Sequence, residues 1–308
     1  MHRSFARRWP TPLGAGARVA LVAPAGPLRG EQELARAIEN ARSFGWEARV
    51  AEHALARDGY FAGTDDVRLR DLARAIEDPA IDGIWCLRGG YGAMRLLDSF
   101  VPGAVGSKAL IGFSDITALH SAIAVRTDLV SFHSPTARQT LSEFSRRSMR
   151  QAIAEHRDPC GVAPAARIIR SGTARGRLAG GNLAVLAALC GTPFAPSLER
   201  AILILEDINE PIYRVDRMLT QLRLSGMLAG CAAIAFGHCT TCAEEADDGA
   251  RSLDEVLEEL AARLGVPCIA GIPVGHIDEQ WTIPLGATAE LDVDARRLTV
   301  DTPGLHAD

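Results

Sequence analysis

Residues 109–123 read Ala-Leu-Ile-Gly-Phe-Ser-Asp-Ile-Thr-Ala-Leu-His-Ser-Ala-Ile, and this stretch decides the fold. The apolar run 109–113 predicts a buried strand, and residues 115–123 predict a helix that begins directly after Ser114. A strand that leads straight into a helix is the repeating unit of parallel α/β sheets.

Similar units precede this stretch. The first has a strand at 19–23 and a helix that ends at Gly45, and the second has a helix from Asp65, a strand at 81–87 and the glycine loop 88–92. Because strands alternate with helices, we expect an α/β protein whose N-terminal domain is a doubly wound, mostly parallel sheet.

The second half of the chain has a different pattern. The polar stretch that begins at Arg138 predicts a domain junction, so we expect an N-terminal domain at 1–145, a linker at 146–175 and a C-terminal domain at 176–308. The C-terminal domain is expected to be a β-rich α/β unit, and the alternation at 288–300 predicts an antiparallel hairpin at the sheet edge.

Further elements of this half follow from apolar runs and helix signals. Strands are predicted at 201–205, 231–236 and 268–274, and helices at 213–224 and from the capping box Ser252-Leu-Asp-Glu255 to Gly265.

Composition narrows the function classes. The 308 residues are 47% hydrophobic and 23% charged with a formal net charge of −5, which is typical of a globular protein and not of a disordered chain or coiled coil. No stretch gathers enough basic residues for nucleic-acid binding, and Lys108 is the only lysine among 33 basic residues. We therefore expect a small-molecule or peptide partner and no nucleic acid.

Cysteine usage and the apolar runs point to a cytoplasmic protein. Seven scattered cysteines do not form a disulfide framework in a chain of this length, which favours a reducing compartment. The first apolar run is too short for a secretion signal, and no run approaches the roughly 18 apolar residues of a membrane helix. Membrane insertion is not expected.

Ser114 is the first candidate for chemistry. A serine at a sharp strand-to-helix turn exposes its hydroxyl at the carboxyl edge of the sheet, and Gly112 leaves room for that turn. The alternative is that Ser114 only caps the helix.

A serine nucleophile needs a base and an orienting carboxylate. His133, His238 and His276 each follow a predicted strand, where a parallel sheet presents groups to ligands. Glu206 closes the buried run 201–205 and is the candidate carboxylate. The alternatives are structural histidines and, for Glu206, an ion pair with an arginine such as Arg214 or Arg217.

Several motifs, in order along the chain, resemble one family. These motifs are Arg88-Gly-Gly-Tyr-Gly92, Gly112-Phe-Ser-Asp-Ile-Thr117, Gly180-Gly-Asn-Leu183, Leu205-Glu-Asp-Ile-Asn-Glu-Pro211 and Pro273-Val-Gly-His276. They are similar to signatures of the serine LD-carboxypeptidases, or muramoyl-tetrapeptide carboxypeptidases, a family that includes the microcin C immunity proteins. The similarity runs from about Val19 to the C-terminal hairpin.

The resemblance implies a catalytic triad of Ser114, His276 and Glu206 in a cleft between two domains. It also implies an oxyanion hole from the backbone amides of Gly90 and Asp115, a homodimer, and catalysis without a metal or cofactor. Amides at a helix start lack intrahelical partners, and a glycine lets the backbone approach an oxyanion, so the local chemistry is compatible with this role.

Other signals stay open at this point. His238-Cys239-Thr-Thr-Cys242 has metal-type side chains but no second ligand pair, so packed or solvent-facing thiols are favoured over a zinc or redox site. The loop at 88–92 lacks the spacing of a dinucleotide-binding loop. Arg88 is interpreted either as a binder of a substrate carboxylate or as part of a structural ion pair.

The sequence thus predicts a cytoplasmic serine peptidase that releases a C-terminal D-amino acid from murein tetrapeptides during peptidoglycan recycling. One alternative is a microcin C-like peptide-nucleotide amidase that confers antibiotic immunity. The other is a non-enzymatic two-domain binder of a small ligand, in which Ser114 has no chemical role.

Overall fold

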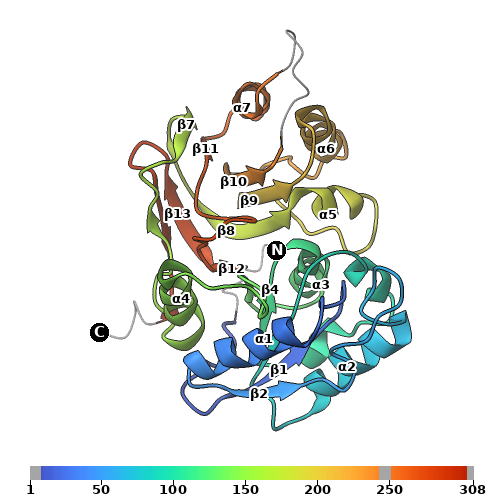
Figure 1. Cartoon of the computed structure of the whole chain (residues 1–308). Helices are drawn as coiled ribbons and strands as arrows, with labels where there is room; N and C mark the ends of the chain where they lie inside the picture. The colour runs from blue at the N-terminus through green and yellow to red at the C-terminus, as the bar shows by residue number, and fades with distance from the viewer. Residues whose placement is uncertain (1–7, 243–250, 304–308) are drawn as a thin grey trace.

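The computed structural model describes residues 8–242 and 251–303 and has two sheets, one in each half of the molecule (Figure 1). The lower sheet has the order β12-β5-β4-β3-β1-β2. Its strands are β1 (Arg18–Val22), β2 (Glu47–Val50), β3 (Gly83–Cys86), β4 (Ala109–Gly112), β5 (Ser131–His133) and β12 (Ile283–Leu285). Strands β1 to β5 are parallel, and only β12 runs antiparallel, against β5.

Helices cover both faces of the lower sheet. They are α1 (Glu31–Ser43), α2 (Asp65–Glu77), α3 (Thr117–Arg126) and α4 (Glu143–Met149), which continues as the π-helical turn η4 (Arg150–Ala154). Buried residues of α1, α4 and η4 pack on one face, and those of α2 and α3 pack on the other. Short 3₁₀ turns are η1 (Ala93–Leu96), η2 (Pro102–Val105) and η3 (Ser114–Ile116). The predicted doubly wound, mostly parallel sheet is confirmed.

The upper sheet is larger and mixed, with the order β6-β14-β13-β8-β9-β10-β11-β7. Its strands are β6 (Gly161–Val162), β7 (Arg167–Arg170), β8 (Thr173–Asn182), β9 (Ala201–Ile208), β10 (Ala233–Thr240), β11 (Cys268–Ala270), β13 (Thr288–Asp292) and β14 (Arg297–Val300). The four central strands β8 to β11 are parallel, and antiparallel pairs flank them. The predicted hairpin is the pair β13–β14.

Three helices cover one face of the upper sheet: α5 (Leu183–Ala188), α6 (Ile212–Leu224) and α7 (Leu253–Leu264). The capping box of Ser252 and Glu255 begins α7, and Gly265, with φ +70°, ends it. The predicted strand 268–274 is shorter in the structure, because β11 stops at Ala270 and Gly271 turns the chain with φ +82°.

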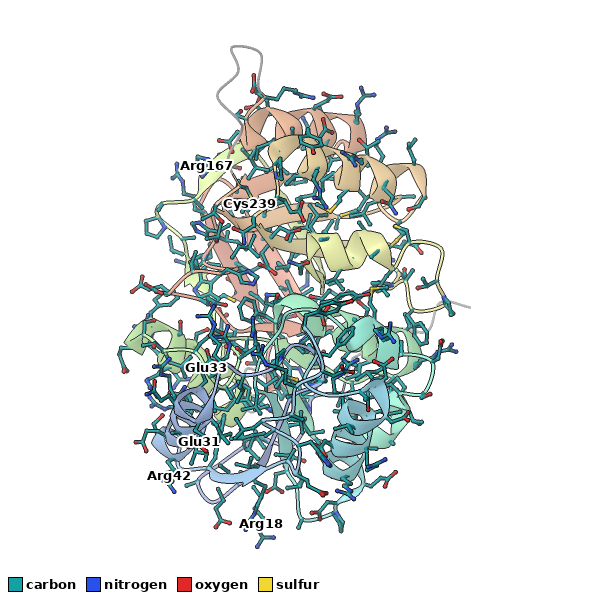
Figure 2. All side chains as sticks on the ribbon, turned by 45° about the vertical axis from the view of Figure 1, so that its right-hand side comes forward. Arg18, Glu31, Glu33, Arg42, Arg167 and Cys239 are labelled. Atoms are coloured by element: carbon teal, nitrogen blue, oxygen red, sulfur yellow. A yellow bond between two sulfur atoms is a disulfide. The ribbon has the colours of Figure 1, made fainter. Side chains whose placement is uncertain are left out.

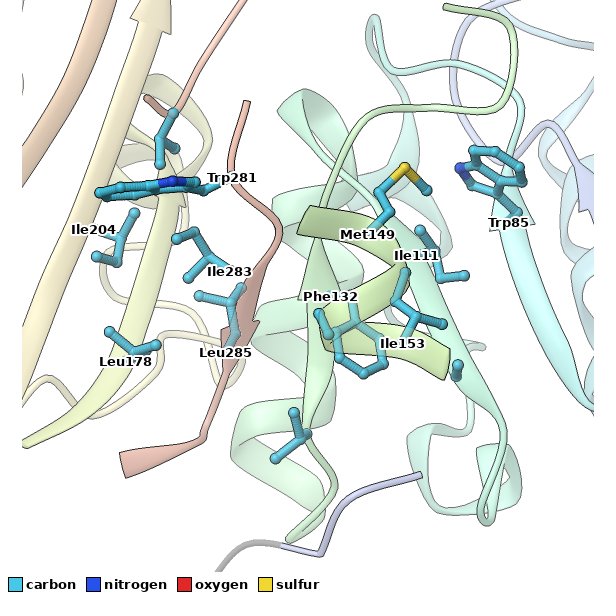
Figure 3. Packing of buried hydrophobic residues seen from close by; sticks show 14 of the residues in the cluster. Trp85, Ile111, Phe132, Met149, Ile153, Leu178, Ile204, Trp281, Ile283 and Leu285 are labelled. Carbon is cyan, nitrogen blue, oxygen red and sulfur yellow. The ribbon is translucent and has the colours of Figure 1, made fainter. Parts of the chain in front are cut away.

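The two sheets share one hydrophobic core. The other face of the upper sheet supplies Leu178 and Ile204, and the lower sheet supplies Ile111 and Phe132, with Ile283 of β12 between them (Figure 3). All these side chains are fully buried. The halves are therefore joined by apolar packing, which holds the strand ends of both sheets in a constant relation.

Residues 146–175, expected as a linker, contain regular structure instead. They include η4 and the strands β6 and β7, which form the two outer edges of the upper sheet. A polar sequence such as the Arg-Ile-Ile-Arg run of β7 is similar to that of a linker, because a strand at a sheet edge has exposed positions.

Candidate active site

Ser114 lies just beyond β4, where the chain turns into η3 and α3. Its φ is +63°, a left-handed conformation that costs about 1–3 kcal/mol for a residue other than glycine. A Cβ on Gly89 would lie 2.8 Å from the Ser114 Cβ, and a Cβ on Gly112 would lie 3.1 Å from side-chain atoms of Ile116. The turn therefore depends on glycine at both positions. Ser114 makes no capping bond to the helix, so the capping alternative is wrong.

His276 lies between Ser114 and Glu206. Its Nδ1 is 2.8 Å from Glu206 Oε2, and its Nε2 is 3.2 Å from Ser114 Oγ. A carboxylate only accepts, so Nδ1 carries the proton and Nε2 is left to accept from the Ser114 hydroxyl. An imidazole held in this way can take a proton from a serine that attacks a carbonyl.

Glu206 is completely buried on β9. Its Oε1 has no hydrogen-bond partner among the described residues, so the histidine is the group that compensates this carboxylate. The alternative of an arginine partner is wrong: Arg214 pairs with Glu210, and Arg217 lies over the Tyr213 ring.

The segment with His276 is fixed from both halves of the molecule. The Thr240 hydroxyl donates to the His276 carbonyl oxygen, and Gly275, with φ +127°, lets the backbone pass the Glu206 side chain. On the other side, Ser145 on α4 donates to the Asp278 carbonyl oxygen and accepts from the Gln280 amide. Sequence analysis missed Thr240 and Ser145. A serine on a polar helix far along the chain gives no sign of this contact.

Asp115 connects the glycine loop to the turn at Ser114. Its buried carboxylate accepts a hydrogen bond of 2.8 Å from the Ala93 amide, directly after the loop. Burial raises the pKa of Asp115, while the Ala93 amide and the charge of Arg68 oppose that rise. The side chain thus joins the segment directly after the glycine loop to the turn at Ser114.

Gly90 has φ +119°, and a Cβ there would lie 3.2 Å from the Gly26 Cα. Its N–H makes no hydrogen bond to another described residue. The loop therefore presents a free donor close to Ser114, because the neighbouring Gly89 has room for no Cβ beside the serine side chain.

The other two candidate histidines do not reach Ser114. His133 is fully buried at the end of β5, and neither of its ring nitrogens has a partner within the described chain. Burial, with the nearby His120 and His276, lowers the pKa of His133 to about 3. His238 is exposed on β10.

Cys239 and Cys242 form a disulfide at the end of β10, in the upper half of the molecule (Figure 2). The expectation of free thiols is wrong, because the turn after β10 brings the two side chains together. The bond also removes both sulfurs as thiolate ligands. Within residues 8–242 and 251–303, no group of three or more His, Cys, Asp or Glu side chains is arranged to hold a metal ion.

A second set of polar contacts joins the sheets beside the site. The Asn182 amide donates to the Thr117 hydroxyl on α3, and its side chain donates to Asp207, the neighbour of Glu206. Burial and the charge of Glu206 raise the pKa of Asp207 to about 6, against the opposing hydrogen bonds from Ile208, Asn182 and Ala184.

A cavity of about 480 Å³ opens beside the glycine loop. Its lining residues are Gly26, Pro27, Arg57, Gly59, Tyr60, Arg88, Gly90 and Tyr91. The ion-pair interpretation of Arg88 is wrong, because no carboxylate among the described residues pairs with it. Its Nη1 instead donates a hydrogen bond of 2.6 Å to the Pro27 carbonyl oxygen.

Comparison with known proteins agrees with this geometry. The LD-carboxypeptidase N-terminal domain matches residues 19–134, and the LD-carboxypeptidase C-terminal domain matches residues 175–291. The chain belongs to the LD-carboxypeptidase family. The predicted family, fold class and enzyme class, a serine-type LD-carboxypeptidase, are confirmed, and the non-enzymatic alternative is set aside.

Two relatives of this LD-carboxypeptidase illustrate the similarity. A putative carboxypeptidase of Streptomyces coelicolor is 41% identical, over 96% of this chain and 97% of its own. The murein tetrapeptide carboxypeptidase of Pseudomonas aeruginosa is 36% identical, over 89% and 93%.

Solved structures share the fold. The muramoyltetrapeptide carboxypeptidase of Oxalobacter formigenes superposes with a TM-score of 0.83 at 30% identity, over 93% of this chain and 98% of that one. The microcin C7 self-immunity protein MccF superposes with a TM-score of 0.85 at 22% identity, over 94% and 97%, which shows the fold alone.

Proposed function

We propose that this LD-carboxypeptidase hydrolyses the L-D peptide bond that releases the C-terminal D-amino acid from murein tetrapeptides. The observation that carries the proposal is the contact chain Ser114–His276–Glu206, which joins the two sheets in a family whose relatives include murein tetrapeptide carboxypeptidases.

In the proposed reaction, Ser114 Oγ attacks the carbonyl carbon of the scissile bond while His276 Nε2 takes its proton. Glu206 orients the imidazole and stabilises its charged form. The oxyanion accepts hydrogen bonds from the amides of Gly90 and Asp115, and the Asp115 carboxylate holds the segment after the glycine loop to the turn at Ser114.

His276 then gives its proton to the nitrogen of the leaving D-amino acid, and the C–N bond breaks to leave an ester on Ser114. A water molecule, deprotonated by His276, attacks that ester and releases the shortened peptide. Each proton taken by His276 is returned, so none of these steps needs a metal or cofactor.

We also propose that the enzyme is located in the cytoplasm and forms a homodimer. No helix in the described part of the chain is long and apolar enough to cross a membrane. An enzyme inside the cell would act on recycled wall fragments, and light scattering of the purified protein tests the dimer directly.

The test is incubation with the murein tetrapeptide and detection of released D-alanine by mass spectrometry. We expect release by the wild type and none by Ser114→Ala. Cleavage of a peptide-nucleotide and not of the tetrapeptide would favour the amidase alternative, and cleavage of neither would contradict the proposal.

A further inference from the structure

The cavity beside the glycine loop shares Gly90 with the predicted oxyanion hole and has arginines in its wall. Arg88 lies two residues before Gly90, and a Cβ on the intervening Gly89 would lie 2.8 Å from the Ser114 Cβ. A Cβ on Gly26 would lie 3.7 Å from Arg88 Nε and 3.6 Å from the Gly90 Cα. The guanidinium and the backbone donor therefore face the same small space.

The length of a single amino acid sets where a carboxylate would lie. When one residue leaves, its carboxylate carbon is within about 4 Å of the carbonyl carbon that the serine attacks. A group that recognises this carboxylate must therefore lie next to the oxyanion donors. Of the residues that line the cavity, Arg57 and Arg88 have a positive charge.

The Arg88 guanidinium has N–H donors that are available to bind a ligand. One nitrogen, Nη1, donates to the Pro27 carbonyl oxygen, which fixes the direction of the side chain. Among the described residues, no carboxylate pairs with Arg88 or Arg57. A planar guanidinium anchored at one nitrogen still presents two others, which is the arrangement that binds a carboxylate through two parallel hydrogen bonds.

The surrounding charge is positive. Glu33 is the nearby carboxylate, but it pairs with Arg138 at 2.7 Å and accepts from the Arg29 amide. Burial and the charges of Arg138, Arg29 and Arg57 lower the pKa of Arg88, with Glu33 opposing. An unpaired cation among like charges gains most from an anionic ligand.

We propose that Arg88, with Arg57 on the same cavity wall, binds the terminal carboxylate of the leaving amino acid and makes this enzyme a carboxypeptidase and not an endopeptidase. The inference rests on the proposed function. It adds the specificity residue: Arg88 positions the C-terminus so that the preceding peptide bond lies over Ser114 and Gly90. The glycines of the wall leave room for a small side chain.

The exposed rings of Tyr60 and Tyr91 lie at the same cavity, with centroids 5.8 Å apart. They limit the space beyond the arginines. A chain that continues past the leaving residue would place a neutral peptide group, in place of a carboxylate, against Arg88.

The experiment compares two substrates, the murein tetrapeptide with a free C-terminal carboxylate and the same peptide with a C-terminal amide. The variants are Arg88→Ala, Arg88→Lys and, as a charge-matched control on α1, Arg42→Ala. Figure 2 places Arg42 farther from the upper half than Glu33. The readout is the ratio of kcat/KM for the acid to that for the amide.

We expect the wild type and Arg42→Ala to prefer the acid strongly. In Arg88→Ala the ratio falls by about 10²- to 10³-fold, the loss expected when a desolvated charge pair loses one partner, and Arg88→Lys is intermediate because it keeps the charge but not the planar fork. If Arg88→Ala does not fold, Arg88→Lys and Arg57→Ala provide the same comparison.

An equal loss on both substrates would show that Arg88 acts only through the loop, and an unchanged ratio would show that it does not bind the carboxylate. Either result overturns the inference. A wild type that releases no D-amino acid from the acid contradicts the proposed function itself.

Discussion

The two halves of the site are built in different ways. On the lower sheet, Gly90 lies on the loop after β3, and Ser114 and Asp115 begin η3 after the neighbouring strand β4. The strained serine turn follows from one continuous strand–helix stretch. On the upper sheet, Glu206 and His276 are 70 residues apart and meet only because β9, β10 and β11 pair in order. The proposed nucleophile is positioned by local structure, whereas the position of the proposed base depends on the whole fold.

Different kinds of contact therefore position Ser114 and His276. Glycines and backbone strain set the direction of Ser114. Hydrogen bonds from distant elements, α4 and β10, set the position of the His276 segment. Substitutions on the two sides should therefore differ in how they divide between activity and stability.

Ser114→Gly tests the local side and has the largest expected effect. It removes the proposed nucleophile, so D-alanine release should fall about 10⁴-fold or more. Glycine adopts a positive φ freely, so the free energy of unfolding should rise by about 1 kcal/mol. Kinetics and urea denaturation measure the two effects. A variant that is less stable than Ser114→Ala would contradict the strain at this turn.

Glu206→Gln tests the distant side. It keeps the shape but not the charge that orients His276, so kcat should fall by about 10³- to 10⁴-fold. The matched control is Glu210→Gln, which changes a carboxylate paired with Arg214 outside the site and should leave kcat near the wild-type value. Equal losses in the two variants would remove Glu206 from its proposed role.

His133→Leu tests whether a buried histidine beside the site has a chemical or only a structural role. The pKa of His133 is about 3, below the ordinary value, so its neutral form favours folding above pH 6.5 and that stability is lost as pH falls toward 3.

As pH falls below 6.5, protonation of His133 in the unfolded chain should lower the free energy of unfolding of the wild type by up to about 1.4 kcal/mol for each pH unit. His133→Leu should lack that part of the acid dependence and keep most of its activity at pH 7.5. Urea denaturation at pH 7.5 and pH 5 is the measurement. A stability difference between the two proteins that is the same at both pH values would count against this account.

Ser145→Ala tests the hydrogen bonds that hold the His276 segment, and its effect is the smallest. It leaves the Gln280 amide unpaired, whereas the Asp278 carbonyl oxygen keeps the hydrogen bond that the Ser142 hydroxyl donates to it. The free energy of unfolding should therefore fall by about 1–3 kcal/mol, and kcat should fall more than KM changes.

The matched variant is Ser148→Ala, which breaks similar bonds to Thr282 and Pro159 farther from His276. It should cost similar stability with a smaller loss in kcat. If both variants lower kcat equally, α4 stabilises the fold without positioning the histidine.

More of the site around Ser114 than of the site around Glu206 and His276 could be predicted from the sequence. The strand–helix stretch around Ser114 predicted the turn, and apolar runs predicted β9 and its terminal Glu206. Residue patterns alone made His133, His238 and His276 equal candidates for the base, and only the family resemblance favoured His276. Geometry separates them, because the buried His133 has no hydrogen-bond partner in the described part of the chain and His238 is exposed.

Two features of the fold could not be predicted from the sequence, for physical reasons. The strand β12 leaves the C-terminal half and pairs with β5 of the lower sheet, and three residues of sequence hold no sign of such a crossing. The strands β6 and β7 look like a polar linker because they are short and lie at sheet edges. Both depend on long-range pairing, which local patterns do not encode.

In the proposed mechanism, Ser114 at the start of η3 in the lower half and His276 on a loop of the upper half act as one catalytic unit. The direct test is a double-mutant cycle on D-alanine release with Ser114→Ala, His276→Ala and the combined variant. If the two residues act as a unit, the second substitution should add almost nothing to the loss caused by the first. Losses that multiply in the combined variant would show that the two residues act independently and would contradict this mechanism.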